Sequence, residues 1–159
     1  MYMNKKIFKR IGIVLLVLLA IVFVFAKVKR ITPLSWGHKQ VNKPMFTDEA
    51  INGYDAVAYF TKAQAVKGNK SYKYNWHDAD WYFSSTENLD SFKSNPEKYA
   101  PQFGGYCSFA VSKGFTANTD PNAFKIINGK LYLCADKKIL QEWLDGGEES
   151  LKKSDANWK

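Results

Sequence analysis

The residue in this sequence with the clearest chemistry is Cys107, which follows Gly104, Gly105 and Tyr106. Glycine allows backbone conformations that other residues avoid, so the two glycines predict a turn that brings the thiol close to other segments of the chain. A thiolate binds soft metal ions and also acts as a nucleophile. A lone cysteine among aromatic residues is also often a small buried hydrophobic side chain, so both interpretations stay open.

Three other groups are candidates for the same site. Asp55 is a carboxylate at the edge of an apolar stretch, and it either binds a ligand near Cys107 or accepts hydrogen bonds from nearby N–H groups as a turn or capping residue. His77 lies in a predicted hairpin loop, where an ordinary polar turn explains it equally well. Cys134 ends the predicted strand 131–133, where strand alternation points it with Tyr132 and opposite Leu131 and Leu133. It either forms a disulfide with Cys107 or remains a free thiol.

The sequence gives little support to catalysis. A thiol nucleophile needs a neighbouring base, and no pattern in the sequence brings His38 or His77 to Cys107. The sequence also lacks a glycine-rich phosphate loop, a His-Glu-x-x-His zinc helix and a serine elbow with flanking glycines. We therefore expect a non-catalytic protein, with a thiol enzyme as the lesser alternative.

The first 30 residues differ sharply from the rest of the chain. An apolar run over residues 11–26 extends to about 7–28 and is bordered by basic side chains at both ends. At about 1.5 Å per residue the span approaches the ~30 Å thickness of a bilayer core. We expect a single-pass anchor over residues 1–30 that contacts membrane lipid, with the following domain extracytoplasmic. The alternative is a cleaved signal peptide and a secreted domain.

Charge is distributed just as unevenly. Residues 1–30 hold seven lysine or arginine residues and no acid, which leaves 16 basic and 15 acidic residues for positions 31–159. The net charge of +8 is therefore mostly a property of the anchor. Nucleic-acid binding needs a clustered basic surface, so a nearly neutral domain argues against a nucleic-acid partner.

The remaining residues predict a juxtamembrane linker over 31–48 and one domain over 49–159. Two hairpins are predicted, one with strands 71–76 and 81–84 around a loop at 77–80, and one around Asn128 and Gly129. Ser84 with Glu87 indicates a capped helix, and Asp136 indicates a second one that ends at Gly146. The predicted fold class is α+β: an N-terminal transmembrane helix, then one small domain with a short antiparallel sheet of hairpins and helices.

Five segments, in this order, resemble a YHS domain. They are residues 53–60 (GYDAVAYF), 81–85 (WYFSS), 92–101 (FKSNPEKYAP), 104–107 (GGYC) and 136–143. The resemblance covers about residues 45–159. It implies a small α+β domain allied to treble-clef-like metal-binding modules, often those that handle copper, and it implies that the GGYC segment with Cys107 is characteristic of a subgroup.

The chain departs from the metal-binding members of that family at the sulfur positions. Those members carry cysteines where this chain has Ser84 and Asn88, and a further pair near residues 54–58, where this chain has none. A tetrahedral zinc site needs four cysteine or histidine ligands, so we expect the inherited site to be vacant and Ser84 to serve as a helix cap.

The function predicted from these residues is that of a membrane-tethered, non-catalytic YHS-type binding domain that handles copper or another soft metal. Its candidate ligand-binding residues are Asp55 and Cys107, with Cys107 as the metal ligand and a copper ion as the candidate cofactor. The alternative is a metal-free module of the cell envelope that binds a small ligand or an envelope protein.

Overall fold

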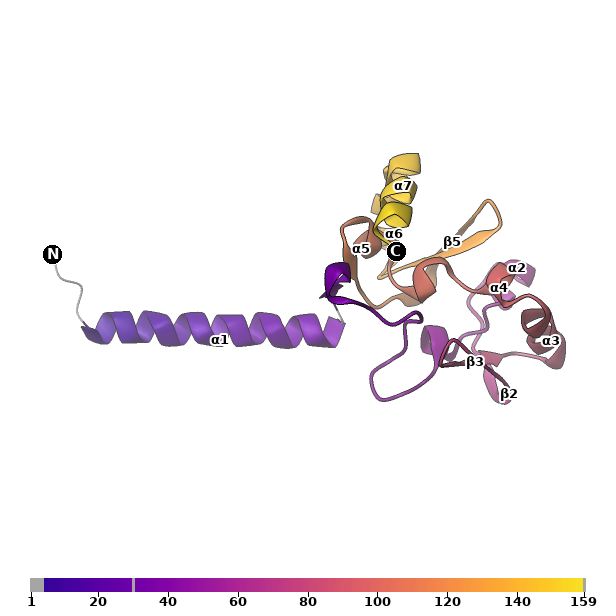
Figure 1. Cartoon of the computed structure of the whole chain (residues 1–159), viewed down its shortest axis with the longest axis horizontal. Helices are drawn as coiled ribbons and strands as arrows, with labels where there is room; N and C mark the ends of the chain where they lie inside the picture. The colour runs from indigo at the N-terminus through magenta and orange to yellow at the C-terminus, as the bar shows by residue number, and fades with distance from the viewer. Residues whose placement is uncertain (1–4, 30, 159) are drawn as a thin grey trace. The chain divides into compact units, whose positions relative to one another are not determined.

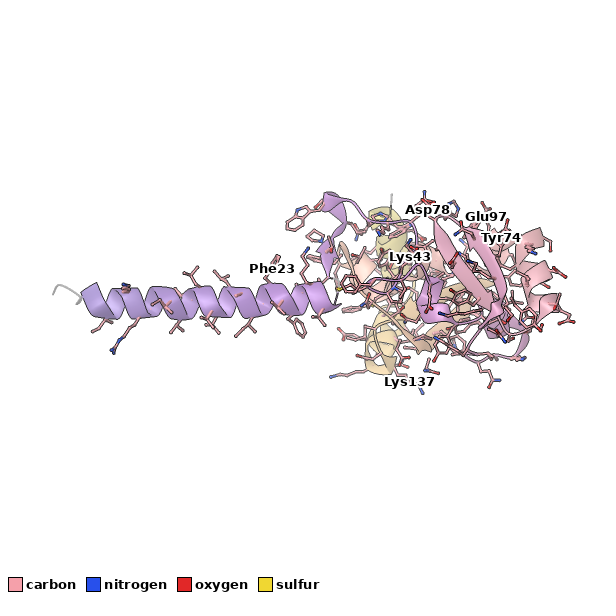
Figure 2. All side chains as sticks on the ribbon, turned by 90° about the horizontal axis from the view of Figure 1, so that it is seen from below. Phe23, Lys43, Tyr74, Asp78, Glu97 and Lys137 are labelled. Atoms are coloured by element: carbon pink, nitrogen blue, oxygen red, sulfur yellow. The ribbon has the colours of Figure 1, made fainter. Side chains whose placement is uncertain are left out.

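The computed structural model describes residues 5–29 and 31–158, and the chain divides into two units between residues 31 and 32. The first unit contains helix α1 (Lys5–Lys29). Its stretch Lys9–Val28 has a mean hydropathy of 3.0 and no buried share, and side chains such as Phe23 point outward around the helix (Figure 2). A helix satisfies its own backbone polar groups, as lipid requires. The length and composition are those of a membrane-spanning helix and also of a signal sequence.

The second unit, residues 32–159, contains both sheet and helix, as predicted for the fold class. Its described strands form three two-stranded antiparallel sheets. The pairs are β1 (Thr32–Pro33) with β4 (Phe115–Thr116), β2 (Asn69–Trp76) with β3 (Ala79–Phe83), and β5 (Asp120–Ile127) with β6 (Lys130–Cys134). The second and third pairs are the two predicted hairpins.

The turn of the first hairpin is shorter than predicted. Trp76 pairs with Ala79, so the connection consists only of His77 and Asp78, with φ of 50° and 54°. The prediction of a four-residue loop at 77–80 is wrong because both residues accept the left-handed conformation of a tight turn without a glycine. The second hairpin is confirmed at Asn128 and Gly129, with φ of 51° and 73°.

The first half of this unit contains α2 (Ala58–Thr61), α3 (Thr86–Ser94) and α4 (Pro96–Tyr99). The residue that caps α3 is Ser85, whose hydroxyl accepts a hydrogen bond from the Asn88 N–H. The predicted cap at Ser84 is therefore wrong by one residue. The extended backbone of Ser85 suits a cap, while the Ser84 hydroxyl is bound elsewhere.

The second half contains α5 (Ser108–Ser112), α6 (Lys137–Asp145) and α7 (Gly147–Asn157). The predicted cap at Asp136 is confirmed, because its carboxylate accepts the Ile139 N–H at 2.8 Å. Gly147 has φ of 54°, which separates α6 from α7. These three helices gather at one end of the globular unit, whereas the β2–β3 hairpin, α3 and α4 lie at the other end (Figure 1).

The core consists of two hydrophobic clusters separated by β6. Leu131 and Leu133 belong to the cluster around Trp81 and Phe92, which we call the α3 cluster. Tyr132 and Cys134 belong to the cluster of Phe103, Tyr106, Cys107, Val111 and Trp143, which we call the thiol cluster. Successive strand residues face opposite sides, so one strand forms a wall of both clusters. This confirms the prediction that Cys134 points with Tyr132 and away from the two leucines.

Residues 32–48, the predicted linker, lie within the globular unit. Val41, Asn42 and Lys43 are buried there. The Asn42 N–H donates to the Gly104 carbonyl at 2.8 Å, and the Lys43 ammonium contacts Asp48 and the Asp78 carbonyl. This segment therefore packs against the turn that precedes Cys107.

Candidate functional site

A left-handed turn positions Cys107. Phe103, Gly104 and Gly105 have φ of 56°, 59° and 79°, within a 3-10 turn, Gln102–Gly105. A Cβ atom on Gly104 would lie 1.8 Å from the Gln40 carbonyl oxygen, so this close backbone approach requires glycine. The predicted turn before the thiol is therefore confirmed, and its physical cause is the packing of residues 40–42 against it.

The turn brings Cys107 to the end of strand β6. The Cys107 N–H donates to the Ala117 carbonyl at 3.1 Å, and its backbone forms an isolated bridge with Leu133. Both Cys107 and Cys134 are free thiols, at 1% and 0% exposure. Of the two predicted alternatives, the structure has the thiols rather than the disulfide.

The two thiols lie in one cluster and influence each other's pKa. A hydrogen bond with the Cys134 thiol, helped by backbone N–H groups and opposed by burial, lowers the pKa of Cys107 from 9.0 to about 7. The same hydrogen bond, together with burial and the Cys107 charge, raises the pKa of Cys134. The pair therefore holds one proton on Cys134 while Cys107 is the sulfur that ionises near neutral pH. We call these two residues the thiol pair.

Asp55 lies in a different place from the thiol pair, next to the α3 cluster. It is fully buried, and its two carboxylate oxygens accept five hydrogen bonds. Oδ1 accepts the N–H groups of Val57 and Ala58 at 2.9 and 3.2 Å. Oδ2 accepts the Ser84 N–H at 2.8 Å, the Ser84 hydroxyl at 2.6 Å and the Asn88 amide at 2.7 Å.

These contacts join the segment before α2 to the start of α3. We call Asp55, Ser84 and Asn88 the carboxylate frame. Hydrogen bonds to a carboxylate are among the strongest in proteins, so these contacts hold the two segments together. The resemblance to metal-binding YHS domains places cysteines at the positions of Ser84 and Asn88 and near residues 54–58. The carboxylate frame therefore links the same two segments that sulfur ligands would link through a metal.

Sequence reasoning identified Asp55 and Ser84 but did not connect them. The signal was the coincidence of three departures from the family pattern: two cysteines replaced by hydrogen-bond donors, and a carboxylate in the segment of the first pair. Asp55 is held by the carboxylate frame and Cys107 by the thiol pair, so the structure does not bring these two predicted site residues together.

Both histidines line a cleft of about 480 Å³. The groups that shift the Cys107 pKa are Cys134 and backbone N–H groups, and no histidine is among them. The polar and aromatic residues that line this cleft include His38, Trp76, His77, Glu97, Asp155 and Trp158. We call this the aromatic cleft.

The donor atoms decide which metal ions fit. Within residues 5–29 and 31–158, no group of three or more histidine, cysteine, aspartate or glutamate side chains is arranged to hold a metal ion. A four-ligand zinc centre therefore does not fit these residues. Cys107 and Cys134 are two buried thiols in one cluster, and sulfur is the kind of ligand that a soft ion such as Cu(I) prefers.

Comparison with known proteins finds one family match, which lies within the globular unit. Residues 57–103 match the family model described as the YHS domain. Searches of curated proteins and of solved structures find no match. The matched segment includes Ser84 and Asn88 of the carboxylate frame and ends before the thiol pair. The comparisons therefore identify a YHS domain match within this chain, over residues 57–103.

Proposed function

We propose that this chain is a membrane-tethered, non-catalytic YHS-type binding domain that holds a soft metal ion, monovalent copper, at Cys107 and Cys134. The observation that supports it most is that two buried free thiols share one hydrophobic cluster and shift each other's pKa, lowering that of Cys107 and raising that of Cys134. Cu(I) prefers soft sulfur ligands, and a pair of them suffices for it.

The surroundings of the thiol pair favour this chemistry. Cys107 ionises near neutral pH, so a thiolate ligand is present without a separate base. Cys134 carries the proton that an incoming cation would displace, and metal uptake should therefore release protons. The thiol cluster around them, with Phe103, Tyr106 and Trp143, excludes water and disfavours hard, strongly hydrated ions.

The proposal of a tether depends on α1, which is long and apolar enough to cross a bilayer. We place the globular unit on the extracytoplasmic side, with the secreted form as the alternative. The proposal of a non-catalytic role is supported by the groups that shift the Cys107 pKa, which are backbone N–H groups and a second thiol rather than a histidine base.

Copper binding can be measured on the full chain in a neutral detergent under reducing conditions. Cu(I) is supplied from a coloured chelator, and transfer to the protein is followed by the loss of the chelator colour. We expect one ion per chain, lost in Cys107→Ala and in Cys134→Ala, and retained in Ser108→Ala, which alters a buried hydroxyl beside Cys107. Equal uptake by all four proteins, or no uptake by the unaltered chain, would reject the proposal.

A second candidate function is a metal-free module that binds a small ligand or an envelope protein. The aromatic cleft favours it, because 480 Å³ is the size of an ordinary small-molecule site. The carboxylate frame also favours it, since hydrogen bonds rather than metal join the two segments. Ligand binding that persists after exhaustive chelation would support this candidate, and binding that needs copper would reject it.

A further inference from the structure

The aromatic cleft has two walls that come from distant parts of the sequence. Trp76 and His77 stand at the turn of the first hairpin, while His38 and Trp158 come from opposite ends of the globular unit's sequence. Phe103 and the buried Trp81 also line it. The site therefore forms only when the whole globular unit is folded.

The rings of the cleft are fixed by other aromatic side chains. Trp158 stacks on His38, with ring centroids 4.0 Å apart and planes at 29°. Trp76 contacts Trp81 and Phe92, with both pairs of centroids at 5.8 Å. Trp76 and Trp158 are only half-buried, so part of each ring remains available to a ligand. Rings held in this way lose little freedom when a ligand binds.

The carboxylate side chains that line the cleft give it negative charge. Glu97 and Asp155 both line it and are both exposed, and none of the described lining residues is lysine or arginine. Figure 2 shows Glu97 at the surface of the globular unit. Neither carboxylate forms an ion pair with another residue in the part of the chain that the structure describes. Lys43, which lines the neighbouring smaller pocket, is already paired with Asp48.

We propose that the aromatic cleft binds a small organic cation with an alkylated ammonium centre. The faces of indole rings attract such cations through their negative π-clouds, and the two carboxylates, which have no cationic partner among the described residues, add electrostatic attraction. An alkylated ammonium group forms few hydrogen bonds, so it can bind against aromatic side chains that offer no strong hydrogen-bond acceptors. This inference gives a ligand class to the second candidate function and is independent of the thiol pair.

Calorimetric titration of the full chain in a neutral, non-zwitterionic detergent tests this inference. The probes are choline, its uncharged isostere 3,3-dimethyl-1-butanol, and phosphocholine. We expect saturable binding of choline, with the isostere weaker by about tenfold or more. Phosphocholine should also bind more weakly, because the carboxylates repel its phosphate. Phosphocholine binding at least as tightly as choline would overturn the free cation in favour of a lipid headgroup.

Variants locate the binding. Glu97→Gln/Asp155→Asn should weaken choline binding by about tenfold, and Trp158→Leu should weaken it similarly. The matched control, Glu142→Gln/Asp90→Asn, changes two exposed carboxylates outside the cleft and should not alter the affinity. Equal affinity in the two double variants, equal affinity for choline and its isostere, or no saturable binding would each overturn the inference.

Failure of this inference can be distinguished from failure of the copper proposal. Cys107→Ala should keep choline binding, since no sulfur lines the aromatic cleft among the described residues. Glu97→Gln/Asp155→Asn should keep Cu(I) uptake. Loss of choline binding in Cys107→Ala, with its circular dichroism unchanged, would contradict the independence of the two sites.

Discussion

The replacement Asp55→Asn tests how strongly the carboxylate frame stabilises the globular unit. It keeps the size of the side chain but removes its charge and turns one of two acceptor oxygens into a donor. If the new amide nitrogen takes the place of Oδ1, it faces the N–H groups of Val57 and Ala58, and two buried donors lose their acceptor. Each unsatisfied buried donor costs about 1–3 kcal/mol, so this orientation costs about 4 kcal/mol.

The opposite orientation is less costly because part of the frame can adapt. With nitrogen at the Oδ2 position, the Ser84 hydroxyl can rotate and the Asn88 amide can turn over so that each accepts instead of donating. Only the Ser84 N–H then remains unsatisfied. The remaining hydrogen bonds also become weaker, because their acceptor no longer carries a charge. Together with the unsatisfied N–H, this weakening should lower the free energy of unfolding of Asp55→Asn by about 3 kcal/mol.

The assay is urea unfolding of the full chain in detergent, followed by tryptophan fluorescence, with Trp81 as a buried reporter in the adjoining cluster. The matched control is Asp90→Asn, the same chemical change at an exposed position of α3, which should stay within about 0.5 kcal/mol of the unaltered chain. A cost for Asp55→Asn below about 1 kcal/mol would refute the reasoning, because it would mean that the five donors do not depend on the carboxylate.

A double-mutant cycle with Ser84→Ala adds a sharper measure. Ser84→Ala removes the 2.6 Å hydroxyl contact but keeps the backbone contact, so we expect a cost of about 1–2 kcal/mol. In the Asp55→Asn background its cost should fall by at least about 0.5 kcal/mol, since the contact has already lost its charge. Additive costs would show that the two residues are not coupled.

Three other predictions concern the turn, the thiol pair and metal removal. Gly104→Ala should cost more than about 3 kcal/mol because its Cβ would meet the Gln40 carbonyl, whereas Gly114→Ala, at φ of 84° with nothing within 4 Å, should cost only about 1–2 kcal/mol. The lowered pKa of Cys107 adds stability that is present above its ordinary pKa of 9.0 and is lost as pH falls through about 7. Urea midpoints should therefore rise between pH 7 and 9, and in Cys134→Ala this rise should disappear; an unchanged rise would contradict the pairing. Exhaustive chelation should leave the purified chain folded, with a cooperative urea transition, because the carboxylate frame joins its segments without metal; loss of that transition would contradict this.

Local patterns predicted most of the secondary structure because their causes are local. Asn128 and Gly129 suit a tight turn by their own backbone preferences, and Asp136 caps a helix three residues away from its hydrogen-bond donor. Ser84 was misassigned for the opposite reason. Its hydroxyl has two possible uses, as a cap or as a donor to Asp55 29 residues away, and only the tertiary fold decides between them.

The candidate sites were less predictable because each depends on contacts between distant segments. The turn at Gly104 could be read from glycine alone, but its partner, the backbone at Gln40, lies in a segment that reads as a linker. The strand alternation gave the direction of Cys134 without its distance from Cys107. The aromatic cleft joins residues near both ends of the globular unit, and no spacing in the sequence indicates that His38 stacks on Trp158.

The hydrogen bonds that stabilise the fold and the thiols that could bind a ligand belong to different clusters, on either side of β6. The carboxylate frame adjoins the α3 cluster, whereas the thiol pair lies in the thiol cluster. The hydrogen-bond partners of Asp55 and the groups that shift the Cys107 pKa have no residue in common. Changes at sites without shared partners usually add. The hydrogen bonds of Asp55 join their two segments without a metal ion. Under the proposed function, we therefore expect an ion to bind and leave the thiol pair without unfolding the globular unit.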